Sequence, residues 1–90
     1  PMTATKTWKV EIFIGEQDQR TYAEARLMPG QEVTLTGTGV ARLNPEDRDV
    51  PEIGDELAVA RALSELSHRL LHAAADDIEQ LTHETVNLPG

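Results

Sequence analysis

The sequence predicts an α+β fold: a three-stranded antiparallel meander packed on one long C-terminal helix. Apolar residues alternate with a period of two in the first half of the chain, and they recur with the period of an α-helix in the second half. Short turn-forming segments separate the alternating runs, which is typical of neighbouring antiparallel strands. A length of 90 residues fits a single domain, residues 1–90.

The first strand is predicted at about residues 6–14, where two sets of side chains alternate. One set faces one side of the sheet (Trp8, Val10, Ile12 and Ile14), and the other faces the opposite side (Lys9, Glu11 and Phe13). A turn over residues 15–18 leads to a second strand at about 20–28. Pro29-Gly30 suits the centre of a type II turn, and a third strand follows at about 32–43.

Two glycines interrupt the third strand. Gly37 and Gly39 lie at alternate positions, so their missing side chains share one face of the sheet. Glycine inside a strand marks either a bulge or the close approach of another backbone, and the sequence leaves both alternatives open.

A proline-bearing acidic loop is predicted at 44–54 and a helix at about 55–82, with Asp55 as its N-cap. The apolar arc of this helix covers about half of the cylinder, wider than the stripe a surface helix needs. The helix is also longer than the strands that would cover it. We therefore expect a homodimer in which the C-terminal half of the helix meets a second copy, through Leu70, Leu71, Ala74, Ile78 and Leu81.

The charge is unevenly distributed along the chain. The net charge is −8, and residues 1–44 carry five basic and five acidic side chains, whereas residues 45–90 carry three arginines against eleven acids. Binding to phosphate draws on cationic side chains, so the acidic half opposes it. We expect no DNA partner, and an RNA partner would have to meet the neutral half. No apolar run is long enough to span a membrane and no signal sequence opens the chain, so a cytoplasmic location is expected.

Candidate metal ligands occur on the helix. His68 and His72 are one turn apart and Asp76 continues the row, but the glutamate of a zinc-protease helix is missing and the row lies on the polar face. We assign no metal and no cofactor. The chain has no cysteine, and both serines lie in the middle of the helix, so nucleophilic catalysis has no support and no enzyme is expected.

A candidate partner-binding face is predicted on the side of the sheet opposite to Trp8 and Val10. Aromatic and cationic side chains alternate there, as in modules that stack RNA bases, and the same composition also suits a protein interface or a dimer seam. The residues of this face are Lys9, Phe13, Tyr22, Arg26 and Met28.

Several segments resemble a small actinobacterial domain family of unknown function, which includes short conserved mycobacterial proteins of the hypoxia and dormancy response. The segments are Trp8-x-Val10-x-Ile12, residues 37–45, residues 51–63, Asp77-Ile78-Glu79 and Thr82-His83. The resemblance implies a fold similar to double-stranded-RNA-binding domains, a homodimer, and a plan similar to part of the ribosome hibernation factors. Asp55 and Glu56 stand where RNA-binding domains carry lysines, which argues against RNA binding through the helix.

The expected function is that of a non-enzymatic, homodimeric, stress- or dormancy-associated protein that binds a macromolecular partner. One alternative is a hibernation-type factor that contacts ribosomal RNA through the sheet face. A second alternative is a regulator that binds a protein through the acidic helix. Salt distinguishes them, because phosphate contacts weaken steeply as salt rises and apolar contacts do not.

Overall fold

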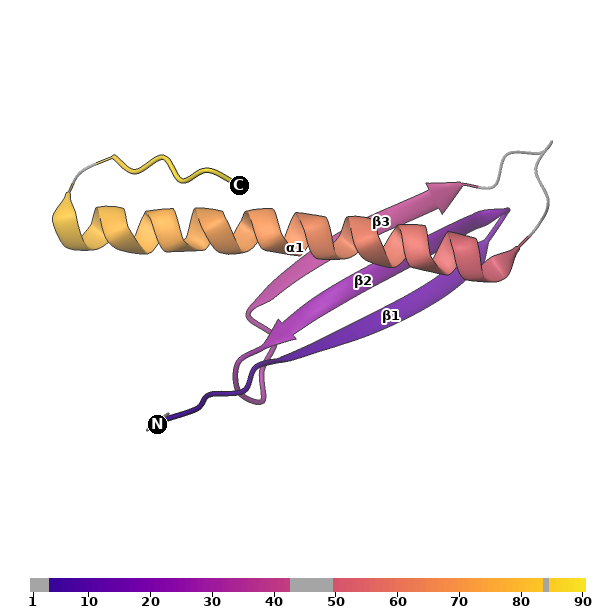
Figure 1. Ribbon diagram of the computed structural model, residues 1–90, viewed down its shortest axis with the longest axis horizontal. Helices are drawn as coiled ribbons and strands as arrows, with labels where there is room; N and C mark the ends of the chain where they lie inside the picture. Colours follow the sequence, from indigo (N-terminus) through magenta and orange to yellow (C-terminus); the bar gives the residue numbers. More distant parts are fainter. Residues whose placement is uncertain (1–3, 43–49, 84) are drawn as a thin grey trace.

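The computed structural model describes residues 4–42, 50–83 and 85–90. In chain order the elements are β1 (Lys9–Gln17), β2 (Arg20–Met28), β3 (Leu35–Arg42) and α1 (Pro51–Thr82). The strands form one antiparallel sheet in the order β1-β2-β3, and α1 lies across one face of it (Figure 1). The predicted α+β class, a three-stranded meander with one long C-terminal helix, is confirmed.

The first hairpin turns later than predicted. β1 continues to Gln17, and the turn is formed by Asp18 and Gln19, whose φ angles of 52° and 61° are both positive. A two-residue turn of this kind matches the right-handed twist of the two strands. The predicted turn over residues 15–18 is therefore wrong, since Gly15 lies inside the ladder opposite Tyr22.

The connection between β2 and β3 also differs from the prediction. Gly30 does not have a positive φ, so a type II turn does not form there. β3 begins at Leu35 rather than at about residue 32, and before it the Thr34 backbone N–H donates a hydrogen bond of 2.9 Å to the Leu27 carbonyl. Residue 43, the last of the predicted strand, lies outside the described residues.

The helix begins one turn earlier than predicted. Pro51 is its first residue and Val50 is the N-cap, so Asp55 is not the cap. Proline is favoured at this position because it has no backbone N–H to leave unsatisfied and its φ is already helical. Of the predicted acidic loop, residues 44–49 lie outside the described residues and 51–54 belong to α1. The helix ends where His83 turns left-handed, with φ 59°.

Small residues form the contact between helix and sheet. Ala58 and Ala62 are completely buried, and they face Gly37 and Gly39 of β3. A Cβ atom built on Gly39 would collide with the Ala58 carbonyl oxygen and lie 2.5 Å from the Ala62 nitrogen. The pairing of β3 with β2 is continuous through both glycines. The two glycines therefore mark the close approach of the helix backbone, and a bulge is ruled out.

The helix covers only part of the sheet. α1 packs on β3 and β2 and barely touches β1. A helix is about 10 Å wide and strands lie about 4.8 Å apart, so one helix covers about two strands. Because the glycines draw α1 towards β3, the strand left uncovered is β1.

The helix also extends beyond the sheet. With 32 residues it is about 48 Å long, and Leu70 is the last helix residue that packs against the core. Residues 71–82 project past the strands, and the C-terminal segment runs back beside this projecting part of α1 (Figure 1). The radius of gyration is 16.9 Å, whereas a compact domain of this length has about 12 Å. No helix within the described ranges is long and apolar enough to cross a membrane.

Candidate functional site

An apolar row that consists of three β1 residues and the tryptophan just before the strand faces the same side as the helix but is not covered by it. We call it the β1 row; its members, with their exposed fractions, are Trp8 (54%), Val10 (39%), Ile12 (39%) and Ile14 (48%). Ile12 pairs with Ala25, which is completely buried under α1, so the row continues the core face of the sheet. A core-type surface is thus open to solvent in a single copy.

A second apolar surface lies on the C-terminal half of the helix. Four of the five predicted dimer residues share one side of it at spacings of four, four and three, and we call them the α1 stripe: Leu70, Ala74, Ile78 and Leu81. Leu81 is 83% exposed. The fifth, Leu71, points to a different side and contacts the chain's own end at Gly90. That end is also held by the Val86 backbone N–H, which donates to a carboxylate oxygen of Glu79 at 2.8 Å.

The two edges of the sheet differ. At the β3 edge, the Arg61 guanidinium donates to the Val40 carbonyl at 2.7 Å, and the Thr38 backbone N–H donates to the Glu65 carboxylate at 3.2 Å. Side chains of α1 thus satisfy this edge, one of the ways in which proteins protect edge strands from pairing with other chains. Within the described ranges, no strand pairs with the outer side of β1.

Glu65 connects α1 to β3 through its ionised form. Hydrogen bonds from the Thr38 backbone and from Arg69 lower the pKa of this carboxyl below its ordinary value. A lowered pKa in the folded state means that the carboxylate stabilises the fold above its unfolded pKa of about 4.3, and that this contribution is lost as the pH falls through the folded value. We expect Glu65→Gln to lower the melting temperature more at pH 7 than at about pH 3. A pH series of thermal melts would reveal it, and an equal loss at both pH values would contradict it.

The predicted partner-binding face lies on the outer side of the sheet, opposite to α1. Lys9 pairs with Met28 in the ladder, and the other three residues follow at alternate positions. Both of its cations, Lys9 and Arg26, already have a glutamate partner. Arg26 forms an ion pair with Glu24 and lies 4.1 Å from the centre of the Phe13 ring, and the Lys9 ammonium is 4.0 Å from Glu11. Each of these two cations therefore already has a carboxylate beside it.

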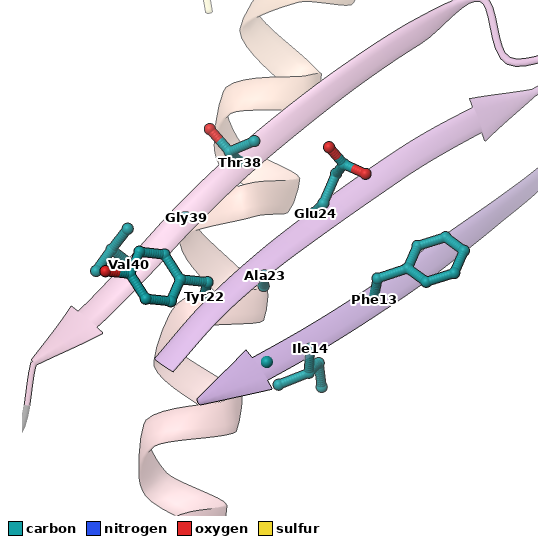
Figure 2. Close-up of a pocket in the computed structure, with 9 residues that line it drawn as sticks. Phe13, Ile14, Tyr22, Ala23, Glu24, Thr38, Gly39 and Val40 are labelled. Carbon is teal, nitrogen blue, oxygen red and sulfur yellow. The ribbon is translucent and has the colours of Figure 1, made fainter. Parts of the chain in front are cut away.

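A shallow hollow of about 510 Å³ opens on the same face. Figure 2 shows the Tyr22 ring beside Val40 and the Phe13 ring on the neighbouring strand, all on the side of the sheet away from the helix. Gly15 pairs with Tyr22, and nothing lies within 4 Å of where its Cβ would be. The missing side chain at Gly15 thus leaves one side of Tyr22 open.

The sequence-based prediction missed two arginines that follow, on the same face, the lining residues Tyr22 and Val40. Arg20 and Arg42 pair across β2 and β3, one same-face position beyond Tyr22 and Val40. Neither arginine side chain forms an ion pair or hydrogen bond with the described residues. Strand alternation alone would have placed Arg20 beside Tyr22, but its neighbour Arg42 follows only from the β2–β3 register.

The candidate metal ligands remain on the exposed surface of the helix. His68, His72 and Asp76 occupy successive turns, and the described residues contain no group of three or more histidine, aspartate or glutamate side chains positioned to hold a metal ion. The candidate binding surfaces are therefore the apolar β1 row, the apolar α1 stripe, and the outer face of the sheet with its aromatic and cationic side chains.

Comparison with known proteins assigns the chain to a family. The Rv2632c-like family description matches residues 6–87. This chain belongs to the Rv2632c-like family. The predicted membership of an actinobacterial family of unknown function is thereby confirmed. The double-stranded-RNA-binding likeness and the link to dormancy stay predictions.

Members of the Rv2632c-like family from mycobacteria are similar over most of their length. The uncharacterized protein Mb1767 of Mycobacterium bovis is 54% identical over 81 residues, which cover 90% of this chain and 85% of that protein. The uncharacterized protein Rv2632c of Mycobacterium tuberculosis is 48% identical over 82 residues, covering 90% and 86%. The crystal structure of Rv2632c superposes with a TM-score of 0.81 at 44% identity, covering 93% of this chain and 99% of that one.

Proposed function

We propose that this protein is a non-enzymatic homodimer that acts by binding a macromolecular partner in a stress or dormancy response. The dimer would bury the β1 row and the α1 stripe, and the outer face of the sheet would remain free for the partner. The observation that carries the proposal is the uncovered core face of β1. The stress and dormancy context rests on the resemblance described from the sequence.

The thin core supports the dimer. Among the described residues, the buried hydrophobic side chains are five alanines and two leucines: Ala23, Ala25, Ala41, Ala58, Ala62, Leu27 and Leu66. No large side chain of the described residues is completely buried. Thirteen large hydrophobic side chains of the described residues are exposed. A small domain without disulfides often gains its missing apolar burial by oligomerising. A second copy carries the same surplus of apolar surface, which makes it a matching occupant.

The protection of only one edge supports the same conclusion. Arg61 and Glu65 occupy the β3 edge, whereas the β1 edge lies next to the exposed β1 row. An edge that is open and apolar favours pairing with another chain. The binding role rests on the outer face, which would stay accessible in such a dimer because it is on the other side of the sheet.

Mass measured by light scattering over a micromolar dilution series tests the assembly. We expect twice the chain mass of 9.9 kDa. Raising the salt concentration should not dissociate the dimer, because the proposed interface is apolar and both copies are acidic. A mass of one chain throughout the series would contradict the proposal.

A further inference from the structure

The outer face of the sheet has a charge pattern that the whole chain does not share. By strand alternation this face carries four cations and two carboxylates (Lys9, Arg20, Arg26 and Arg42; Glu11 and Glu24). The two carboxylates are paired with Lys9 and Arg26. The two cations of this face that have no carboxylate partner among the described residues, Arg20 and Arg42, are therefore together at one end of it, in a chain whose net charge is −8.

That positive end is formed by Arg20 and Arg42. They are directly opposite each other in the ladder, and like charges in this position destabilise a sheet. An anion bound between them would remove the repulsion, and the planar guanidinium groups suit the oxygens of a phosphate. Both side chains are exposed and have no partner among the described residues.

The hollow beside the arginines suits an aromatic ring. Tyr22 is 41% exposed, and Gly15 leaves the space next to it empty. The step from Arg20 to Tyr22 is two residues along the strand, or about 6.6 Å, comparable to the separation of a phosphate from the base of its own nucleotide. Stacking of bases on exposed aromatic side chains of a sheet is a common mode of single-strand recognition.

A polar group lines the same hollow. Glu24 accepts from Arg26 through Oε2 only, which leaves Oε1 without a partner among the described residues. A carboxylate oxygen there accepts a hydrogen bond from the amino group of a base. Figure 2 shows Glu24 on the same side of the sheet as Tyr22.

We propose that the outer face binds a nucleotide unit, with its phosphate between Arg20 and Arg42 and its base in the hollow beside Tyr22. The same chemistry occurs in single-stranded RNA and in a free nucleotide. The inference names a ligand class for the partner-binding face of the proposed function and rests on that function. It does not depend on the β1 row or the α1 stripe.

The test uses fluorescence anisotropy of a labelled single-stranded RNA of about 12 nucleotides, titrated with the full chain over a salt series. We expect binding that weakens as salt rises. Arg20→Ala and Arg42→Ala should each weaken binding and reduce the salt slope by about 0.7, and Tyr22→Ala should weaken binding about ten-fold. Competition by a ribonucleoside monophosphate as strong as that by RNA would assign the site to a free nucleotide, and weaker competition would assign it to RNA; either result supports the proposal.

Lys9→Ala is the matched control, because it removes one positive charge from the same face but from the opposite end, where Glu11 is its partner. We expect it to bind RNA like the unchanged chain. An equal loss of RNA affinity in Lys9→Ala and Arg20→Ala would overturn the proposal. So would a protein that binds a phosphopeptide but not RNA, or one that binds neither RNA nor the monophosphate at low salt. Circular dichroism checks that each variant folds. If the protein is a dimer but does not bind RNA, this inference is contradicted and the proposed dimer is not. If the protein binds RNA as a monomer, the proposed dimer is contradicted and this inference is not.

Discussion

Gly39→Ala is expected to destabilise the fold by about 3 kcal/mol or more, which is at the upper end of the range for overpacking. Its new Cβ would collide with the Ala58 carbonyl oxygen, lie 2.5 Å from the Ala62 nitrogen and lie 2.8 Å from the Arg61 Cβ. Two of these obstacles are backbone atoms of a long helix, so the helix as a whole would have to move away from β3. For a domain of this size, the melting temperature should fall by on the order of 15 °C.

The control for this prediction is Gly15→Ala, which makes the same change in β1, the strand at the other edge of the sheet. Nothing lies within 4 Å of the added Cβ at Gly15, and alanine is slightly favoured over glycine inside a strand. Thermal melts followed by circular dichroism should show little change for it. Protein concentration must be the same in every melt, because dimerisation shifts the melting temperature. Equal melting temperatures for Gly39→Ala and the unchanged chain would refute the close-approach explanation.

Ile12→Asp is expected to dissociate the proposed dimer. It places a charge in the middle of the β1 row, and in a symmetric dimer the change occurs in both copies. A cost of about 2 kcal/mol for each copy weakens the dimer about a thousand-fold. The light-scattering mass at micromolar concentration should then be that of one chain, while circular dichroism should still show a folded protein, because Ile12 is 39% exposed in a single copy.

Phe13→Asp makes the same substitution one residue later and serves as the matched control. Phe13 is exposed to a similar extent, 47%, but it lies on the outer face of the sheet. We expect it to leave the dimer intact. The opposite result, a dimer lost in Phe13→Asp and kept in Ile12→Asp, would place the interface on the outer face and would argue against both proposals made above.

The sequence predicts the class of fold well because each main element has a strong periodic pattern. The alternation around Val10 and Ile12 defines β1 and its two faces, and Gly37 and Gly39 indicate the place where another backbone comes close. The same two glycines also place the helix near β3, at the edge opposite to β1. The uncovered β1 row could have been inferred from them.

The boundaries and the site were harder to predict. The prediction places Pro51 in the acidic loop, whereas in the structure it is the first residue of α1; proline is compatible with both places. The prediction places Gly15 in a turn, yet β1 continues to Gln17 and the turn forms at Asp18 and Gln19. Their positive φ angles are not typical of glutamine, so the residue types gave little warning. The pairing of Arg42 with Arg20 depends on strand register, which these turn positions determine.

The contact between two copies of the chain in the proposed dimer is tested most directly by nuclear magnetic resonance of a mixed sample. One half of the protein carries ¹³C-labelled methyl groups and the other half is unlabelled, so that filtered spectra report only contacts between copies. The account predicts such contacts for methyl groups of the β1 row and the α1 stripe, namely Val10, Ile12, Ile14, Ile78 and Leu81, and none for Val40 on the outer face. Contacts confined to Val40, or no contacts between copies at all, would contradict it.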